Sequence, residues 1–379
     1  MSYKKNMTDL ELYEKLRRLL KGGLPKHEVT YKLISNMYTE DEAKILISSF
    51  KKAGKPINIR EIAKLSGVPR PKLKEILNNM YDRGKLTKLG PLYILLPYLP
   101  GGFEVYFTTC KDDPERMKKV AEAHLELFKL GFPLELSSSK YTIYRVIPTI
   151  KPTEKSIKVN EELAVQHQIM PYEILKKYLS DANPKIYAVV PCSCRNAAKL
   201  AGEPCKQTDE NYCVTTGTLA QMVIEQGVGR EVNLDELMEI MERAEKEGLV
   251  HETFNMQDTA TFVCNCCSCC CGFLKSVKEL NNYGSITKSN FDPRINRELC
   301  TLCENCKNIC PMNAIYHHWP HKEDLSDDMM KIRLDLCIGC GICASNCPSG
   351  AITLEKVRNI IPIKSQAEMR VKLAEERIH

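Results

Sequence analysis

The chain carries the sequence CTLCENCKNICP at residues 300–311 and repeats its pattern as CIGCGICASNCP at residues 337–348. In each copy, three cysteines are separated by two residues, and a fourth follows three residues later, directly before a proline. Both copies continue as Pro-x-x-Ala-Ile, ending at Ile315 and Ile352. This internal repeat predicts two pseudo-symmetric halves, each of which binds a metal cluster.

The cysteine spacing predicts how the ligands are shared. Three thiolates spaced by two residues can curl around three irons of a cubane, whereas the fourth, before the proline, turns away and reaches the other cluster. Zinc knuckles are the alternative, but zinc sites use paired Cys-x-x-Cys units. We therefore assign one [4Fe-4S] cluster to each of two sets: Cys300, Cys303, Cys306 and Cys347, and Cys337, Cys340, Cys343 and Cys310.

On these motifs, residues 290–356 resemble the bacterial-type 2[4Fe-4S] ferredoxin domain. The resemblance implies transfer of single electrons at low potential. The stretch between the halves is longer than in small ferredoxins and carries His317, His318, Trp319 and His321. Three histidines suggest a metal site, but the polar continuation over residues 322–328 favours a solvated loop.

Composition limits the class of protein. The 379 residues suffice for two or three domains, and 18 of the 19 cysteines lie after residue 190. In a secreted chain this density would predict disulfides. Residues 1–21 lack the apolar stretch of a secretory signal, and no run approaches the roughly 18 apolar residues of a membrane helix. We expect a cytoplasmic protein whose cysteines bind metal. A net charge of +6 is too small to indicate nucleic acid by itself.

Ten further cysteines lie between residues 192 and 271. They include the motif Pro-Cys-Ser-Cys-Arg at residues 191–195 and six cysteines within residues 264–271. Six thiols cannot all bind one mononuclear ion, so this density favours polynuclear sites. We expect one or two additional iron–sulfur clusters, held by a subset of Cys192, Cys194, Cys205, Cys213, Cys264, Cys266, Cys267, Cys269, Cys270 and Cys271.

Three alternatives stay open for this second group. A thiolate-rich zinc store would also use many cysteines, and one cysteine pair could perform thiol–disulfide exchange. Structural zinc could bind to Cys192, Cys194, Cys205 and Cys213. No Gly-x-Gly-x-x-Gly motif and no Walker loop occur, so the sequence offers no evidence for a flavin or nicotinamide site.

The N-terminal part has the signals of a small helical domain. Thr39 is a predicted helix cap with Glu42 at the capping-box position, and Asn58 is predicted to cap a short second helix. A longer helix follows over about residues 70–83, and then a hairpin over residues 86–96. This order of elements resembles a winged helix-turn-helix domain. Beyond it, residues 103–109 alternate like a strand.

Winged helices bind DNA or dock other proteins. Arg70, Lys72 and Lys74 lie at the start of the longer helix, where such helices meet base edges. Lys85 and Lys88 could contact phosphates from the hairpin. Because acidic residues in these helices weaken the basic patch, we expect a docking or structural role in preference to DNA binding.

The fold class expected is α+β multidomain, with a winged helix-turn-helix, a Cys-rich α/β middle domain and a ferredoxin-like 2[4Fe-4S] domain. The sequence divides into a winged-helix-like domain (1–100), an α/β bridging segment (101–185), a Cys-rich metal-cluster domain (186–290), the ferredoxin domain (291–356) and a polar C-terminal tail (357–379). This layout is similar to a group of iron–sulfur proteins from anaerobic bacteria and archaea, on the motifs at 191–195, 264–272 and 300–348. The resemblance implies electron transfer.

Three functions follow as hypotheses. The first is an electron-transfer protein or subunit that serves a redox partner protein or an oxidoreductase complex. The second is an iron–sulfur oxidoreductase whose middle domain reduces a substrate. The third is a redox-responsive regulator that binds DNA.

Overall fold

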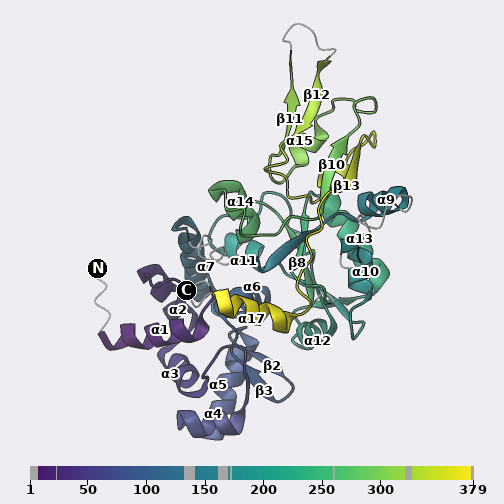
Figure 1. Ribbon diagram of the computed structural model, residues 1–379. Helices are drawn as coiled ribbons and strands as arrows, with labels where there is room; N and C mark the ends of the chain where they lie inside the picture. The colour runs from purple at the N-terminus through teal and green to yellow at the C-terminus, as the bar shows by residue number, and fades with distance from the viewer. Residues whose placement is uncertain are drawn as a thin grey trace. The chain divides into compact units, whose positions relative to one another are not determined.

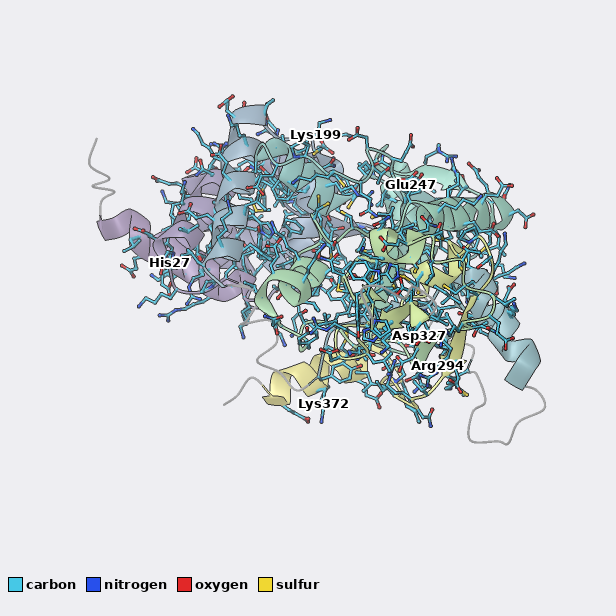
Figure 2. The ribbon with its side chains drawn as sticks, turned by 90° about the horizontal axis from the view of Figure 1, so that it is seen from above. His27, Lys199, Glu247, Arg294, Asp327 and Lys372 are labelled. Atoms are coloured by element: carbon cyan, nitrogen blue, oxygen red, sulfur yellow. The ribbon has the colours of Figure 1, made fainter. Side chains whose placement is uncertain are left out.

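The computed structural model describes residues 7–22, 24–131, 141–160, 170, 173–258, 261–320 and 327–376. The chain forms two compact units. The first comprises Met1–Leu136 and Pro191–Cys205, and the second comprises Ser137–Val190 and Lys206–His379. The elements are labelled in Figure 1. Side chains are drawn in Figure 2, where Glu247 marks the end of helix α13 and Arg294 marks strand β10.

The first unit is mainly helical around one apolar core. The capping box of Thr39 and Glu42 is present, and Asn58 caps its short helix, so both predicted caps are confirmed. The small antiparallel sheet has the order β1-β3-β2. The elements before residue 100 are α1 (Met7–Leu20), α2 (Glu28–Met37), α3 (Glu40–Ser49), β1 (Pro56–Asn58), α4 (Ile59–Ser66), α5 (Arg70–Asp82), β2 (Thr87–Leu89) and β3 (Leu92–Ile94).

The order α3, α4, α5 and then a hairpin is the order of elements expected from the sequence. Its assignment to the winged-helix fold stays a prediction. An irregular turn η1 (Tyr98–Gly102) leads to the remaining helices of the unit, α6 (Phe103–Thr109), α7 (Pro114–Lys129) and α11 (Ser193–Leu200).

The strand expected at residues 103–109 is wrong, because this segment is helix α6. Phe103, Tyr106 and Phe107 are buried at the i, i+3, i+4 spacing of one helical face. Aromatic and β-branched residues also occur in strands. Over seven residues, the local sequence therefore did not distinguish the periodicity of a helix from that of a strand.

Helix α11 carries part of the Pro-Cys-Ser-Cys-Arg motif, yet it belongs to the first unit. It packs on α6 and α7. Asn196 Nδ2 donates a hydrogen bond of 2.8 Å to the backbone oxygen of Phe107. The chain therefore leaves the second unit after Val190 and returns to it at Lys206.

The expected phosphate contact of Lys85 is wrong. Its side chain is fully buried, with Nζ 3.2 Å from carboxylate oxygens of both Glu42 and Asp112. Lys88 Nζ donates a hydrogen bond of 2.8 Å to Asn78 Oδ1 and lies over the ring of Tyr81. Lys85 therefore ties the start of α3 to the α6–α7 connection, and its ammonium group is not available to a nucleic acid.

The second unit contains a six-stranded antiparallel sheet with the order β4-β8-β9-β6-β5-β7. Its strands are β4 (Tyr144–Ile147), β5 (Tyr187–Val190), β6 (Cys213–Thr216), β7 (Arg230–Val232), β8 (Val250–Phe254) and β9 (Phe262–Cys266). The helices around it are α9 (Ile150–Asn160), α10 (Leu175–Ser180), α12 (Gly217–Glu225), α13 (Leu234–Lys246) and α14 (Gly272–Leu280).

The C-terminal part of this unit has two short antiparallel pairs, β10–β13 and β11–β12. The hairpin β11–β12 extends beyond the β10–β13 pair in Figure 1. His317 and His318 lie on β11, whereas His321 falls outside the described residues. The elements are β10 (Phe291–Ile295), α15 (Asn305–Ile309), β11 (Ile315–His318), β12 (Met329–Ile332), α16 (Ile342–Ser345), β13 (Ile352–Lys356) and α17 (Gln366–Glu376). In the described parts of the chain, no helix combines the length and the apolar character needed to cross a membrane.

We predict that Lys85→Met destabilises the first unit by about 3 kcal/mol, because it leaves the buried Glu42 carboxylate without its cation. The measurement is hydrogen exchange of helices α3 and α5 in the full chain. The control is Lys44→Met, which removes an exposed ion pair with Glu40 and should change stability by less than about 1 kcal/mol. Equal protection factors in the two variants would contradict the prediction.

Candidate metal centres

The structure brings together Cys300, Cys303, Cys306 and Cys347. These four residues line one hollow, with the rest of its wall formed largely by apolar side chains. Cys303 is exposed, Cys300 and Cys347 are half-buried, and only Cys306 is buried. We call these four residues the outer thiol set.

A second set is formed by Cys337, Cys340, Cys343 and Cys310, which we call the inner thiol set. The first three are buried and Cys310 is partly buried. Two of these sulfurs accept backbone hydrogen bonds, Cys310 Sγ from Ala314 N at 3.3 Å and Cys337 Sγ from Gly339 N at 3.4 Å. Such N–H···S bonds stabilise thiolates and tune the potential of a bound cluster. The cysteine of each half that precedes the proline thus lies with the three cysteines of the other half.

Burial opposes ionisation of these thiols. It raises the pKa of Cys306 to about 11 and places those of Cys340 and Cys343 still further above the ordinary thiol range. At Cys347 burial acts in the same direction, but hydrogen bonds from Ser349 and from backbone N–H groups outweigh it and lower the pKa. Because only a thiolate binds a metal, a bound cation would offset the cost of burying these groups. Two sets of four thiols, with backbone N–H donors to two of the inner sulfurs, fit two [4Fe-4S] clusters.

The two halves make the same backbone turn with different residues. Leu302 and Glu304 have φ values of 55° and 58°, and the equivalent Gly339 and Gly341 have values of 69° and 79°. A Cβ on Gly341 would collide with Thr149 Oγ1 and approach Leu354 Cδ1 to 2.9 Å. The inner half therefore requires glycine, while the outer half accepts side chains in the left-handed region at an energetic cost.

A third group of thiols lies in the middle domain, on one face of the β8–β9 pair. Cys264 and Cys266 are two residues apart on β9 and so point to the same face. Glu252 on β8 is the register partner of Cys264. One oxygen of Glu252 and the sulfurs of Cys266 and Cys271 all lie within 4.8 Å of one another. All three residues are buried, and we call them the Glu252 group.

Burial and neighbouring side chains oppose the loss of a proton from the residues of the Glu252 group. Hydrogen bonds with Cys264 and Cys271, together with burial, raise the pKa of Cys266. Burial, and then the proximity of Cys271, raises the pKa of Glu252 well above its usual range. No motif marked Glu252 in the sequence. The available signal was an acidic residue inside a strand, β8, in which every residue is buried.

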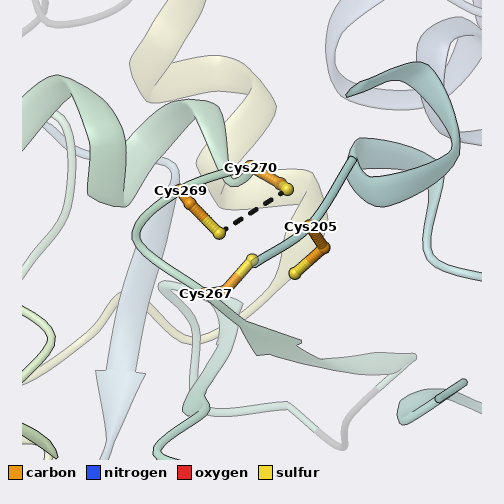
Figure 3. A group of neighbouring side chains, drawn as sticks. All are labelled: Cys205, Cys267, Cys269 and Cys270. Atoms are coloured by element: carbon orange, nitrogen blue, oxygen red, sulfur yellow. Dashed lines mark hydrogen bonds between the residues drawn. The ribbon is translucent and has the colours of Figure 1, made fainter. Parts of the chain in front are cut away.

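The other cysteines of this motif lie on the turn before α14. Cys267, Cys269 and Cys270 have their sulfurs within 4.8 Å of one another, and those of Cys269 and Cys270 are 3.8 Å apart (Figure 3). The sulfurs of Cys267 and Cys269 raise the pKa of Cys270. Figure 3 also draws Cys205, the residue at which the first unit ends.

The remaining candidate ligands are divided between the two units. Cys192 is buried at the N-cap of α11, and Cys194 lies within that helix and packs against the core of the first unit. Cys213 is buried at the start of β6 in the second unit. The assignment of any of these cysteines to a metal stays a prediction.

The two four-cysteine sets define a ferredoxin-type iron–sulfur protein. In agreement, residues 299–351 match the model of the 4Fe-4S dicluster domain. The pyruvate synthase subunit PorD of Methanocaldococcus jannaschii is 43% identical over 72 residues, which are 19% of this chain and 73% of that protein. The chain therefore belongs, through this domain, to the 4Fe-4S dicluster ferredoxin family.

Two further relatives show how much of each chain this similarity covers. An uncharacterized ferredoxin of Methanocaldococcus jannaschii is 35% identical over 96 residues, 25% of this chain and 51% of its own. A tetrathionate reductase subunit of Archaeoglobus fulgidus is 34% identical over 73 residues, 19% of this chain and 29% of its own. The chain thus spans about half the length of this uncharacterized ferredoxin. No solved structure matches the chain.

We predict that Gly341→Ala disrupts the inner half, with loss of about four irons per chain, because the added methyl group has no room. The matched control is Glu304→Gly at the equivalent outer position, where a side chain is removed from a residue in the left-handed backbone conformation. It should retain all the iron, because glycine adopts this backbone conformation without strain. Iron analysis of both variants after anaerobic purification makes the measurement, and full iron in Gly341→Ala would refute the prediction.

Proposed function

We propose that the chain is an electron-transfer protein, or a subunit of an oxidoreductase, that carries single electrons between a partner and its own middle domain. In this proposal the outer and inner thiol sets each hold a [4Fe-4S] cluster, and the cysteines of residues 264–271 hold at least one more iron–sulfur centre. When bound, such clusters take up and release one electron at a time.

One observation carries the proposal: a single apolar core contains thiols of both the ferredoxin part and the middle domain. Cys337 and Cys340 of the inner set belong to the same cluster of buried side chains as Cys266 and Cys271. Ile338 is also part of it. Centres bound by these thiols would share one packed apolar core, which supports electron exchange between them.

A polar chain connects the same two regions. Ser345, between two cysteines of the ferredoxin part, donates a hydrogen bond of 2.9 Å to Glu245. Glu245 lies 3.1 Å from His251 Nε2, and His251 Nδ1 lies 2.5 Å from Asn265 Oδ1. Asn265 stands between Cys264 and Cys266 on β9. These buried contacts hold α16 against the β8–β9 pair, and so fix the separation of the two thiol groups.

The outer set is the place where a partner would exchange electrons, because its cysteines are the least buried. Trp319 is 58% exposed, and its ring lies 4.7 Å from that of His317. His317 Nδ1 in turn lies 2.9 Å from Glu304, in the loop between Cys303 and Cys306. Aromatic residues of this kind dominate binding energy at protein interfaces. The names of two relatives, a pyruvate synthase subunit and a tetrathionate reductase subunit, support an oxidoreductase as the partner.

The second hypothesis, a substrate-reducing centre, is favoured by one observation, the three adjacent thiols of Cys267, Cys269 and Cys270. Substrate-dependent reoxidation of the dithionite-reduced protein would distinguish this hypothesis from a carrier. The known relatives give no support to DNA binding.

The first prediction of this proposal concerns metal content. The intact chain should contain about twelve to sixteen irons with matching acid-labile sulfide, corresponding to three or four cubanes. Cys266→Ser should lose about four irons and keep about eight to twelve. The control is Cys110→Ser, which alters an exposed cysteine outside all these groups and should lose none. About eight irons in the intact chain, with zinc in addition, would refute an iron–sulfur centre in the middle domain.

The second prediction concerns the partner surface. Trp319→Ala should weaken reduction by a protein donor, pyruvate synthase with its substrates, by about tenfold in apparent affinity, a loss of about 1.4 kcal/mol. Reduction by dithionite and the iron content should not change. Ile361→Ala, another exposed apolar residue of the same unit, is the control. An equal effect of both variants would show that the surface around Trp319 is not the docking site.

A further inference from the structure

Glu252 differs from the other buried acidic residues of the second unit in its surroundings. Glu173 pairs with Lys356 at 2.8 Å, Asp292 pairs with Arg358, and Glu245 contacts His251. Glu252 is 1% exposed, yet among the described residues it takes part in none of the ion pairs found. Its neighbours are thiols.

The thiols approach the carboxyl group from two elements. Cys271 Sγ lies 3.9 Å and 3.8 Å from the two carboxyl oxygens of Glu252. Cys266 Sγ is within 4.8 Å of both partners. Cys264, the register partner of Glu252, interacts with Cys266 on the same sheet face. One oxygen and two sulfurs therefore lie around one point, all three from buried residues, and the sulfur of Cys264 adjoins this group through Cys266.

When ionised, this arrangement is costly without a cation. A buried carboxylate or thiolate without an opposite charge is disfavoured by several kcal/mol. A metal placed in the Glu252 group supplies that charge and uses its buried oxygen and sulfur donors. Thiolates are the usual ligands of iron–sulfur clusters, and a carboxylate is a harder donor that iron also accepts.

We propose that Glu252 is a metal ligand, which binds one iron of the middle-domain centre through a carboxylate oxygen while Cys264, Cys266 and Cys271 bind through sulfur. The inference rests on the proposed function, since it assumes that this centre is an iron–sulfur cluster. It adds that one iron has an oxygen ligand and differs chemically from the other irons.

Glu252 can have one of two roles at this centre. As a ligand, the side chain must offer an anionic oxygen to the metal. As a neutral acid beside the cluster, it would donate a hydrogen bond to sulfur, and an amide of the same shape could replace it. Glutamine and cysteine substitutions distinguish these roles because glutamine keeps the hydrogen-bond donor and cysteine keeps an anionic ligand.

The test uses the full chain, purified anaerobically and enriched in a Mössbauer-active iron isotope. The intact protein should show one iron subsite with parameters distinct from those of thiolate-bound iron. Glu252→Gln should lose that subsite and about one iron per chain. Glu252→Cys should keep the iron and convert the distinct subsite to a thiolate type. Glu173→Gln, which alters a buried acid that pairs with Lys356, should leave the spectrum unchanged.

Each contrary result has its own meaning. Unchanged iron content and an unchanged spectrum in Glu252→Gln would overturn the role of Glu252 as a ligand, while leaving the proposed function intact. No more than eight irons in the unaltered chain, or zinc in place of the additional iron, would overturn the proposed function itself. If Glu252→Gln fails to fold, the spectrum of Glu252→Cys still decides, because a distinct subsite that persists there excludes Glu252 as its ligand.

Discussion

The C-terminal part of the chain depends on one constraint: the last cysteine of each half must lie with the first three cysteines of the other half. Cys347 lines the outer hollow, and Cys310 lies with the inner set. Neither half can therefore complete its thiol set alone. The pairing of β10 with β13 and of β11 with β12 holds the halves in the required register. Four short strands with little core of their own suffice because metal ligation can contribute much of the folding energy.

The constraint is symmetric, but the two halves have adapted differently to their surroundings. The inner loop is packed against β10, β13 and the residues after β4, so only glycine fits at positions 339 and 341. The outer loop faces solvent and has Leu302 and Glu304 at the same positions. Here Glu304 contributes interactions that glycine cannot make, with Lys307 and His317. The two halves therefore differ although their sequences repeat: the outer half is the more exposed one, and the inner half packs against the rest of its unit.

The sequence was most informative where a residue's role depends on its close neighbours along the chain. Helix caps such as Thr39 and Asn58 act within one turn, and the cysteine spacing reflects a local wrapping of the backbone. It was least informative where tertiary contacts decide. The sequence predicted Lys85 at the surface, but in the structure its side chain is buried beside two carboxylates. The segment at residues 103–109 became a helix because its aromatic face enters the core.

Glu252 illustrates the same limit at the metal centres. Cysteine density alone marks residues 264–271, but it cannot divide them into groups. The strand geometry does so: Cys264 and Cys266 share a face with Glu252, whereas Cys267, Cys269 and Cys270 gather on the turn that follows. The crowded thiols of both groups resist ionisation, and each would lose its protons only to a metal. A cation bound at this face would therefore supply the positive charge that its buried acids need once they ionise.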